Sequence, residues 1–396
     1  MRQQDFLKQL FESIEHKEYV LLGNNINLLR TGVNGSDIDI VSSVSDFGNL
    51  ISILQRLIDH VDGLSIVLSI KSPRYYYIRL IYTSSVRAWG LAIDVLNDGS
   101  YYRGVQWSYY KELSVEPRIV DNIFFVSEET YKWTKTMKFE LRTHSIGLSL
   151  YIKNSIYSRI PGYVHKGMTR RSVSYVSKNV SIWNDIKLVK YKLKSNPRLV
   201  LSVSGPDGVG KSTLINHLEK IFQDAFNKNV CLMHLRPGLF RRLSAFKKGE
   251  HQQETTAVPQ LVESSYAMSL LKIGYYFLDY TIGYFIRVRL ISWRTPTVFI
   301  FDRYYTDLLS QPARFGIKGF SGLRTFLFRF IPKPQLSVLL YEDPENILRR
   351  KAELTLEELS CEIERQKLLF DQNIFDIRIK NESTISSMHS VLRELS

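Results

Sequence analysis

The sequence is poor in the residues that build several kinds of site and scaffold. It holds only two cysteines, Cys231 and Cys361, which lie far apart and in no metal-ligand spacing. This scarcity argues against a disulfide framework or a zinc site, and it fits a reducing compartment. The first 20 residues carry charges throughout and lack the continuous apolar core of a signal peptide. We therefore expect a cytoplasmic protein.

Long apolar runs are also lacking. The most apolar stretch, IGYYFLDYTIGYFI at 273–286, contains Asp279 and is shorter than the roughly 20 apolar residues of a membrane span. Lys272, Asp279 and Arg287 recur at intervals of seven and eight residues, which places them on one narrow stripe of an apolar helix. The pattern indicates a buried helix, with a helix that touches a membrane surface as the alternative. We expect no integral membrane span.

Acidic residues are outnumbered, with 39 Asp or Glu against 53 Lys or Arg and a formal net charge of +14. The excess is concentrated between Lys132 and Arg198, where 15 basic residues stand against two acids. Such a segment fits nucleic acid, anionic lipid head groups or phosphorylated ligands, and a solvated helical connector is the alternative. Binding of nucleic acid through 132–198 stays open, as does formation of a homodimer.

The patterning predicts two domains, since 396 residues are too many for one ordinary core. In the first part, strands are expected at 19–23, 36–43, 64–70, 75–83 and 90–96, with helices at 5–16, 47–60 and 128–150. In the second part, strands are expected at 199–205, 229–235, 297–303 and 336–342, with a helix near 262–293. We expect an α+β domain at 1–145 and a basic helical appendix or linker at 146–197. An α/β domain with a parallel sheet flanked by helices should follow at 198–396.

The stretch SVSGPDGVGKST at 202–213 matches a phosphate-binding loop. The motif G-x-x-x-x-G-K-[ST] is met, between an apolar strand and a helix, by Gly205, Gly210, Lys211 and Ser212. Glycines let the backbone turn its N–H groups toward a phosphate, and the helix N-terminus favours the same anion. Lys211 would bridge the β- and γ-phosphates of ATP, and the Ser212 hydroxyl would bind Mg²⁺. Thr213 is expected at the helix start or near the adenine.

The stretch TVFIFDRYYTDLLSQ at 297–311 indicates phosphoryl transfer. Asp302 ends an apolar strand and would lie beside the phosphate loop, while Arg303 would offer a bidentate cation to an acceptor phosphate. A salt-bridged strand end is the alternative. A GTPase would instead need D-x-x-G after the second strand and N-K-x-D for the base, and the sequence has neither.

The second half, about 198–390, resembles the thymidylate kinase-like branch of the nucleoside monophosphate kinases. The resemblance rests on SGPDGVGKST, FDRYYTD and PQLSVLLYEDPENILRRK, and it places Asp207 and Gly208 inside the nucleotide-binding loop. It implies that Asp302 and Arg303 act in acceptor-phosphate binding and catalysis, with Tyr304 as a further substrate contact. ATP and Mg²⁺ are the implied cofactors.

Two further parts of the chain follow from this resemblance. Arg349 and Arg350, on the helix after the strand 336–342, would belong to a lid over ATP. Arg236 in HLRPG would meet the acceptor phosphate, although the family usually has R-E-P-G there. We expect the acceptor to be a nucleoside monophosphate or a similar small molecule. Because the region 239–262 has no counterpart in the family, thymidylate and other phosphorylated or hydroxylated molecules stay open as acceptors.

The first half carries a second candidate site. Asp37 and Asp39 in SDIDI lie two residues apart, so on a strand their side chains point the same way. Asp94 lies in the apolar run GLAIDVL, where a carboxylate is costly without a partner. Carboxylates that converge from two strands suit Mg²⁺ ions that hold a triphosphate. The alternative is unrelated turn and surface acids.

This pattern is similar to the DNA polymerase β-like nucleotidyltransferase superfamily, over about 1–145. Gly23, Asp37, Asp39 and Asp94 follow its order of an apolar strand, a glycine, D-x-D and a later acid. The resemblance implies a Mg²⁺-dependent nucleotidyltransferase-like domain in which Gly23 and Asn24 contact the triphosphate. Asn24 departs from the family, which has Ser or Gly there.

Two other functions are compatible with the same sequence. In the first, the kinase and nucleotidyltransferase halves act on a sugar or glycan end in surface-polysaccharide assembly, as the unmatched region and the apolar helix suggest. In the second, the chain is an ATP-regulated module that binds nucleic acid. Aromatic residues that would stack on bases lie in or near the basic segment, at Tyr151, Tyr157, Tyr163, Tyr175 and Trp183.

Overall fold

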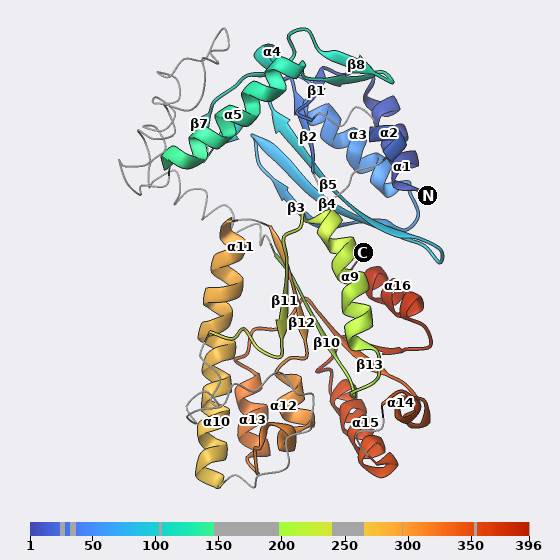
Figure 1. The fold of residues 1–396 in the computed structure, drawn as a ribbon, viewed down its shortest axis with the longest axis vertical. Helices are drawn as coiled ribbons and strands as arrows, with labels where there is room; N and C mark the ends of the chain where they lie inside the picture. Colours follow the sequence, from blue (N-terminus) through green and yellow to red (C-terminus); the bar gives the residue numbers. More distant parts are fainter. Residues whose placement is uncertain are drawn as a thin grey trace. The chain divides into compact units, whose positions relative to one another are not determined.

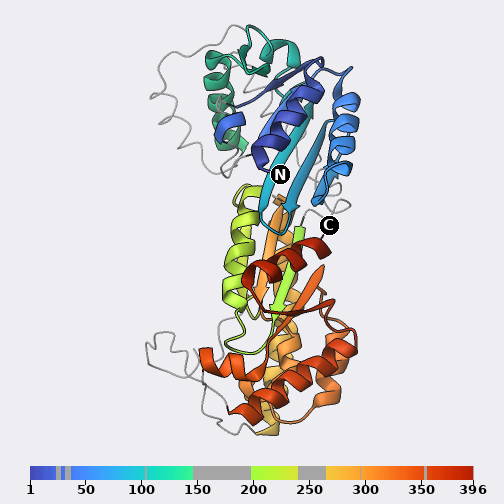
Figure 2. The same ribbon diagram turned by 90° about the vertical axis from the view of Figure 1, so that its right-hand side faces the viewer.

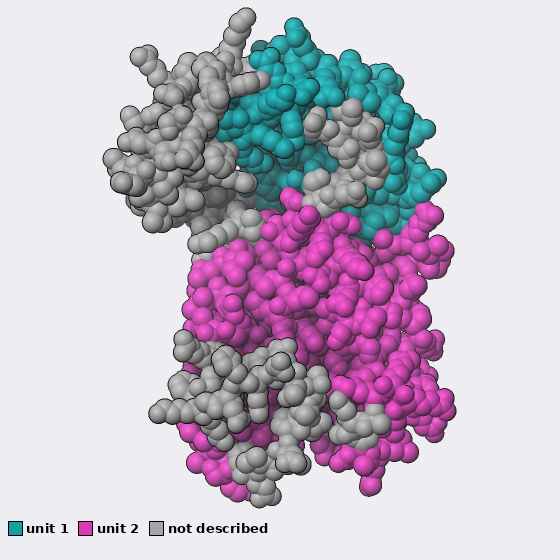
Figure 3. Space-filling view, in the orientation of Figure 1, with its two compact units in different colours: residues 1–82, 89–196 teal, residues 83–88, 197–396 magenta. Residues whose placement is uncertain are grey.

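The computed structural model describes residues 1–23, 28–31, 37–102, 105–145, 198–239, 265–294, 296–351 and 355–395 (Figure 1). They divide into two compact units, shown in different colours in Figure 3. Unit 1 takes its described residues from 1–82 and 89–145, and unit 2 from 83–88 and 198–395. The predicted linker 146–197 and its aromatic residues lie outside the described residues.

Unit 1 is built on a mixed sheet with the strand order β3-β4-β5-β2-β1-β9-β8. Its strands are β1 (Tyr19–Leu21), β2 (Ile38–Ser42), β3 (Leu64–Lys71), β4 (Tyr75–Thr83), β5 (Ala88–Asn97), β8 (Arg118–Val120) and β9 (Ile123–Phe125). A separate pair is formed by β6 (Tyr101–Tyr102) and β7 (Val105–Gln106). In the middle of the sheet β2 and β5 run parallel, with Asp39 opposite Asp94. The register therefore brings together two acids that are far apart in the sequence.

Helices lie on both faces of this sheet. They are α1 (Gln3–Ile14), α2 (Leu28–Thr31), α3 (Phe47–Asp59), α4 (Tyr110–Leu113) and α5 (Glu128–Ser145). Ile93 of β5 belongs to the apolar cluster with α1 and α3, whereas Leu96 packs in the other cluster with Trp133 of α5. Because strand residues alternate between faces, Asp94 shares the face of Leu96. The acids of β2 and β5 thus lie on the α5 side, away from the α1–α3 core.

Unit 2 contains a five-stranded sheet whose neighbouring strands are all parallel, in the order β11-β12-β10-β13-β14. The strands are β10 (Arg198–Ser204), β11 (Val230–His234), β12 (Thr297–Asp302), β13 (Leu336–Tyr341) and β14 (Ile377–Lys380). Helices flank both faces (Figure 1, Figure 2). This arrangement confirms the α/β class predicted for the second half. The fifth strand, β14, was not predicted, because four residues reading IRIK carry too little apolar pattern.

The helices of unit 2 follow the strands. They are α9 (Lys211–Ala225), α10 (Tyr266–Leu278), α11 (Leu290–Arg294), α12 (Thr306–Ser310), α13 (Ser321–Phe328), α14 (Pro344–Arg350), α15 (Leu356–Asp371) and α16 (Thr384–Glu394). Two π-helical turns, Asp279–Gly283 and Phe285–Arg289, join α10 to α11. Within the described chain, none of the helices combines the length and the apolar character that crossing a membrane requires.

The apolar helix that begins with α10 differs from its prediction. Its polar stripe points into unit 2, where Lys272 donates to the Gly316 carbonyl and Arg287 donates to the Pro237 carbonyl. Its outer face is apolar, and Leu271 and Phe285 are 68% and 47% exposed. The prediction of a buried helix is therefore wrong for this outer face. The polar side chains bind loop carbonyls of unit 2, so the polar stripe faces inward and apolar side chains face outward.

Candidate active sites

The phosphate-binding loop leads from β10 into α9 through tight backbone turns. Gly205 and Gly210 have φ values of +150° and +102°. A Cβ atom at Gly205 would lie 2.4 Å from the Leu340 carbonyl oxygen, and one at Gly210 would lie 2.4 Å from the Asn381 amide nitrogen. Glycine is required at both positions by conformation and by space. Gly208 lies at the turn between them with a φ of +85°.

Lys211, the first residue of α9, is buried in the loop. Its Nζ atom donates to the carbonyls of Gly205, at 2.9 Å, and Pro206, at 2.6 Å. Burial, aided by the charge of Arg303, lowers the pKa of Lys211 to about 8, so the amine is mainly charged at neutral pH. Ser212 and Thr213 are exposed in the first turn of α9, where the helix N-terminus favours anions.

Asp302 lies at the end of β12, and the β10–β12 register pairs it with Val203, just before the loop. His234 at the end of β11 donates from Nδ1 to Asp302 Oδ2 at 3.3 Å. The Oδ1 atom of Asp302 is buried and has no hydrogen-bond partner among the described residues. Burial acts to raise the pKa of Asp302, but the His234 hydrogen bond and the Lys211 charge outweigh it and lower the pKa.

Arg303 connects three elements of this site. It is 2% exposed, and its NH1 group donates to Asp307 Oδ2 of α12 at 2.6 Å. Its NH2 group donates to Asp207 of the phosphate loop, whose other oxygen accepts from Arg314 at 2.6 Å. Burial opposes ionisation of Asp207, but Arg303, Lys211 and Arg314 outweigh it and hold the pKa of Asp207 far below its usual range.

Tyr304 does not lie where the sequence placed it. Its side chain is 1% exposed, and its hydroxyl donates to the Pro332 carbonyl. Its ring packs edge-on against Tyr280 and Phe301 in the core beside the sheet. The expected substrate contact by Tyr304 is therefore corrected: this tyrosine is a packing residue, because the backbone turn at Arg303 directs it inward.

Arg236 is held by a carboxylate that sequence reasoning treated only as part of a stripe. Its NH1 group donates to Asp279 Oδ2 at 2.7 Å, and Asp279 is 0% exposed. Asp279 also accepts from the backbone N–H groups of Gly238, at 3.1 Å, and Leu239, at 2.8 Å. The guanidinium of Arg236 lies 5.0 Å from the ring centroid of Tyr275. The loop after β11 is thus fixed by the helix that follows.

Glu362 of α15 is a site residue that sequence reasoning missed. Gln311 donates to its Oε1 atom, and Gln366 donates to the same atom at 3.3 Å. Burial raises the pKa of Glu362 to about 7, against the opposing charge of Arg303 and with the help of Asp207. No motif marks this glutamate, because only the folded position of α15 brings it near the phosphate loop.

Arg349 and Arg350, at the end of α14, line a cavity of about 390 Å³. Its other lining residues are Glu342, Asp343, Asn346, Lys380 and Glu382. Asn381, between two of these, donates to the Val209 carbonyl of the phosphate loop at 2.6 Å. This hydrogen bond places the cavity beside the loop.

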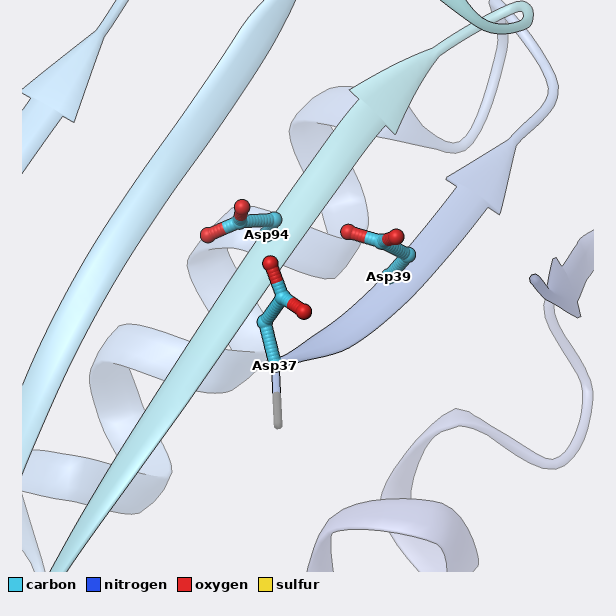
Figure 4. A group of neighbouring side chains, drawn as sticks. All are labelled: Asp37, Asp39 and Asp94. Carbon is cyan, nitrogen blue, oxygen red and sulfur yellow. The ribbon is translucent and has the colours of Figure 1, made fainter. Parts of the chain in front are cut away.

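In unit 1, Asp37, Asp39 and Asp94 form one carboxylate cluster. One oxygen of each lies within 4.8 Å of the others, and Figure 4 shows the three side chains turned toward one another. Asp94 extends from β5, Asp39 from β2, and Asp37 precedes β2 by one residue. Gly23 follows β1 with open space around it, so no steric need for glycine is evident there. Asn24 lies outside the described residues.

A buried arginine forms an ion pair with one acid of the carboxylate cluster. Arg79 of β4 is buried and donates to Asp94 Oδ1 at 2.5 Å. Burial, with the repulsion of Asp37 and Asp94, raises the pKa of Asp39 to about 7, while Lys138 of α5 and Arg79 partly offset this. Burial likewise raises the pKa of Asp94 despite its bond to Arg79. The oxygen-only donor set and its excess of negative charge fit a hard divalent cation such as Mg²⁺.

Comparison with known proteins finds one kind of likeness, to solved structures, and no match to a protein family or a curated protein. Among solved structures, a thymidylate kinase from Ehrlichia chaffeensis is similar at 15% identity, with 50% of this chain and 99% of that chain covered and a TM-score of 0.34. A likeness at that level carries no argument about function, which has to come from the sites themselves.

Proposed function

We propose that unit 2 is an ATP-dependent phosphotransferase that moves the γ-phosphate of ATP to a small acceptor. The observation that carries this proposal is the position of Asp302. Register in the parallel sheet sets this carboxylate beside the glycine loop and Lys211. In open α/β sheets, ligands bind at the carboxyl ends of the strands, and the loop and Asp302 both lie at that edge.

The residues around the loop suit the parts of such a reaction. Backbone N–H groups of the loop and the N-terminus of α9 would hold the phosphates, with Lys211 leaving the carbonyls of Gly205 and Pro206 to meet them. The cavity beside Arg349 would receive the far end of the nucleotide. Ser212 would hold Mg²⁺, which when bound offsets the charge of the phosphates.

For unit 1 we propose a Mg²⁺-dependent nucleotidyltransferase-like site. Support comes from the three converging carboxylates, one of which, Asp94, forms an ion pair with Arg79. Asp37, Asp39 and Asp94 would hold the metal, which when bound neutralises a triphosphate and polarises it for attack. A direct check is Mn²⁺ binding by calorimetry, which Asp39→Asn should weaken at least tenfold.

A screen with γ-labelled ATP tests the phosphotransferase proposal. Lys211→Ala is expected to lower transfer of the label, to water or to any acceptor used, by on the order of 10²–10³. Lys220→Ala is the matched control, because Lys220 is an exposed lysine on the same helix. If Lys211→Ala keeps the turnover of the wild type, the phosphotransferase proposal is wrong.

A further inference from the structure

We propose that the acceptor of unit 2 is an uncharged hydroxyl compound, such as a nucleoside or a sugar, and that Asp302 receives the proton of its hydroxyl group. This inference rests on the proposed phosphotransferase function. Of the acceptors that the sequence left open, it selects a hydroxylated molecule over the phosphorylated one that the resemblance to thymidylate kinase-like proteins favoured. The arginines that would bind an acceptor phosphate near Asp302 are already paired with carboxylates.

Arg303, the cation expected to bind an acceptor phosphate, is neutralised by carboxylates. Its partner Asp307 is 1% exposed and lies one helical turn away, so this pair is part of the core rather than a surface contact. Asp207 makes a second ion pair with the same guanidinium. A dianionic phosphate would compete with both acids and bring further negative charge to a site that also holds Glu362.

Arg236, the second expected cation, is paired in the same way. Asp279 is fully buried and also accepts two backbone N–H groups of the loop that carries Arg236. Releasing Arg236 to an acceptor would leave a buried carboxylate without its cation and would open this loop. The two arginines that would bind a phosphorylated acceptor are therefore already held in ion pairs within the chain.

Asp302, by contrast, has an oxygen atom that can accept a further hydrogen bond. His234 occupies only Oδ2, and the buried Oδ1 atom has no hydrogen-bond partner among the described residues. A buried carboxylate oxygen of this kind is suited to accept a hydrogen bond from a ligand hydroxyl. Its location beside the phosphate loop puts that hydroxyl next to the γ-phosphate of a bound nucleotide.

The proposed step moves a proton from the acceptor hydroxyl to Asp302 and a phosphoryl group from ATP to the acceptor oxygen. The acceptor O–H bond breaks and its proton passes to the Asp302 carboxylate. The acceptor oxygen forms a new bond to the γ-phosphorus, while the bond from that phosphorus to the β,γ-bridging oxygen breaks and ADP leaves. The sum is ROH and ATP giving the phosphate ester, ADP and a proton, which Asp302 later releases to solvent.

The first arm of the test measures anion binding by calorimetry. With a non-hydrolysable ATP analogue bound, wild-type protein is expected to show no binding of inorganic phosphate or thymidine monophosphate at millimolar concentration. Asp307→Asn, which releases one side of Arg303, should bind inorganic phosphate at least tenfold more tightly than the weakest affinity that the titration detects, and Asp371→Asn serves as the exposed control. Wild-type binding of thymidine monophosphate that is lost in Arg303→Met would overturn the inference while leaving the phosphotransferase function intact.

The second arm uses water as the simplest neutral hydroxyl acceptor and needs no variant of Asp307. Asp302→Asn is expected to slow basal ATP hydrolysis by on the order of 10²-fold or more while leaving the affinity for the ATP analogue unchanged. Unchanged hydrolysis in Asp302→Asn would overturn the role of Asp302. Failure of wild-type protein to bind the ATP analogue at all would instead remove the proposed function, and the inference with it.

Discussion

The two units place their buried acids in opposite electrostatic settings. In unit 1 three carboxylates converge, and Arg79 forms an ion pair with one of them, Asp94. In unit 2 the acids Asp207, Asp279 and Asp307 each form an ion pair with an arginine. The first arrangement carries an excess of negative charge that favours a cation from outside, whereas in the second each of these three acids is already paired with an arginine.

This difference shows how the charge balance of a site, rather than its motif, indicates the ligand. An unbalanced cluster costs free energy until a metal or a proton neutralises it. A balanced network is already organised and leaves little attraction for a further anion. The comparison can be tested by removing one charge from either side.

The largest effect is expected from Asp279→Ala in unit 2. The variant removes the buried carboxylate that accepts hydrogen bonds from Arg236 and from two backbone N–H groups, so the free energy of unfolding should fall by about 3–5 kcal/mol. Thermal and urea unfolding measure this change. Asp371→Ala, at an exposed position, is the control. A loss of stability no greater than that of the control would show that the Asp279 pair is not needed.

A smaller loss is expected from Arg79→Met in unit 1. Without Arg79, Asp94 loses its ion-pair partner, and the cost should be about 2–3 kcal/mol because Asp94 can take up a proton instead. Mg²⁺ should restore part of this stability, and it should raise the midpoint of thermal unfolding more in Arg79→Met than in the wild type. The exposed Arg56→Met is the control. Equal Mg²⁺ effects in all three proteins would argue against a metal at the cluster.

The smallest effect concerns Glu362, whose pKa burial raises to about 7. A pKa above the unfolded value of about 4.3 means that the proton-bound form stabilises the fold at low pH. That stability is lost as the pH rises through about 7. Glu362→Gln should therefore become more stable than the wild type between pH 5 and pH 8, by on the order of 1–2 kcal/mol after solvent screening. Thermal midpoints across this range should show no such trend for Glu364→Gln, an exposed control on the same helix.

Much of the fold follows from local pattern. Apolar runs mark β10, β12 and β13, and the glycines of the loop have the left-handed or otherwise strained backbone that the motif requires. The i, i+2 spacing of Asp37 and Asp39, with Asp94 in an apolar run, was enough to predict that the three acids come together. These features depend on residues close in sequence or on the alternation of strands.

The remaining features depend on contacts between distant residues. The partners of Arg303 include Asp207, which lies 96 residues earlier, and Arg236 is bound by Asp279, which lies 43 residues later. Glu362 gains its raised pKa mainly from burial in the fold, and Tyr304 follows the left-handed backbone of Arg303 into the core. A single sequence identifies such charged residues but not their partners, so it could not predict the charge balance of the site.

The most direct measurement follows ATP labelled separately on the α- and γ-phosphates in wild-type protein, Lys211→Ala and Asp39→Asn. The account predicts that Lys211→Ala loses transfer of the γ label but keeps transfer of the α label, and that Asp39→Asn shows the reverse. Loss of both transfers in either variant, or γ transfer that survives in Lys211→Ala, would contradict the claim that the two units hold independent active sites of opposite charge balance.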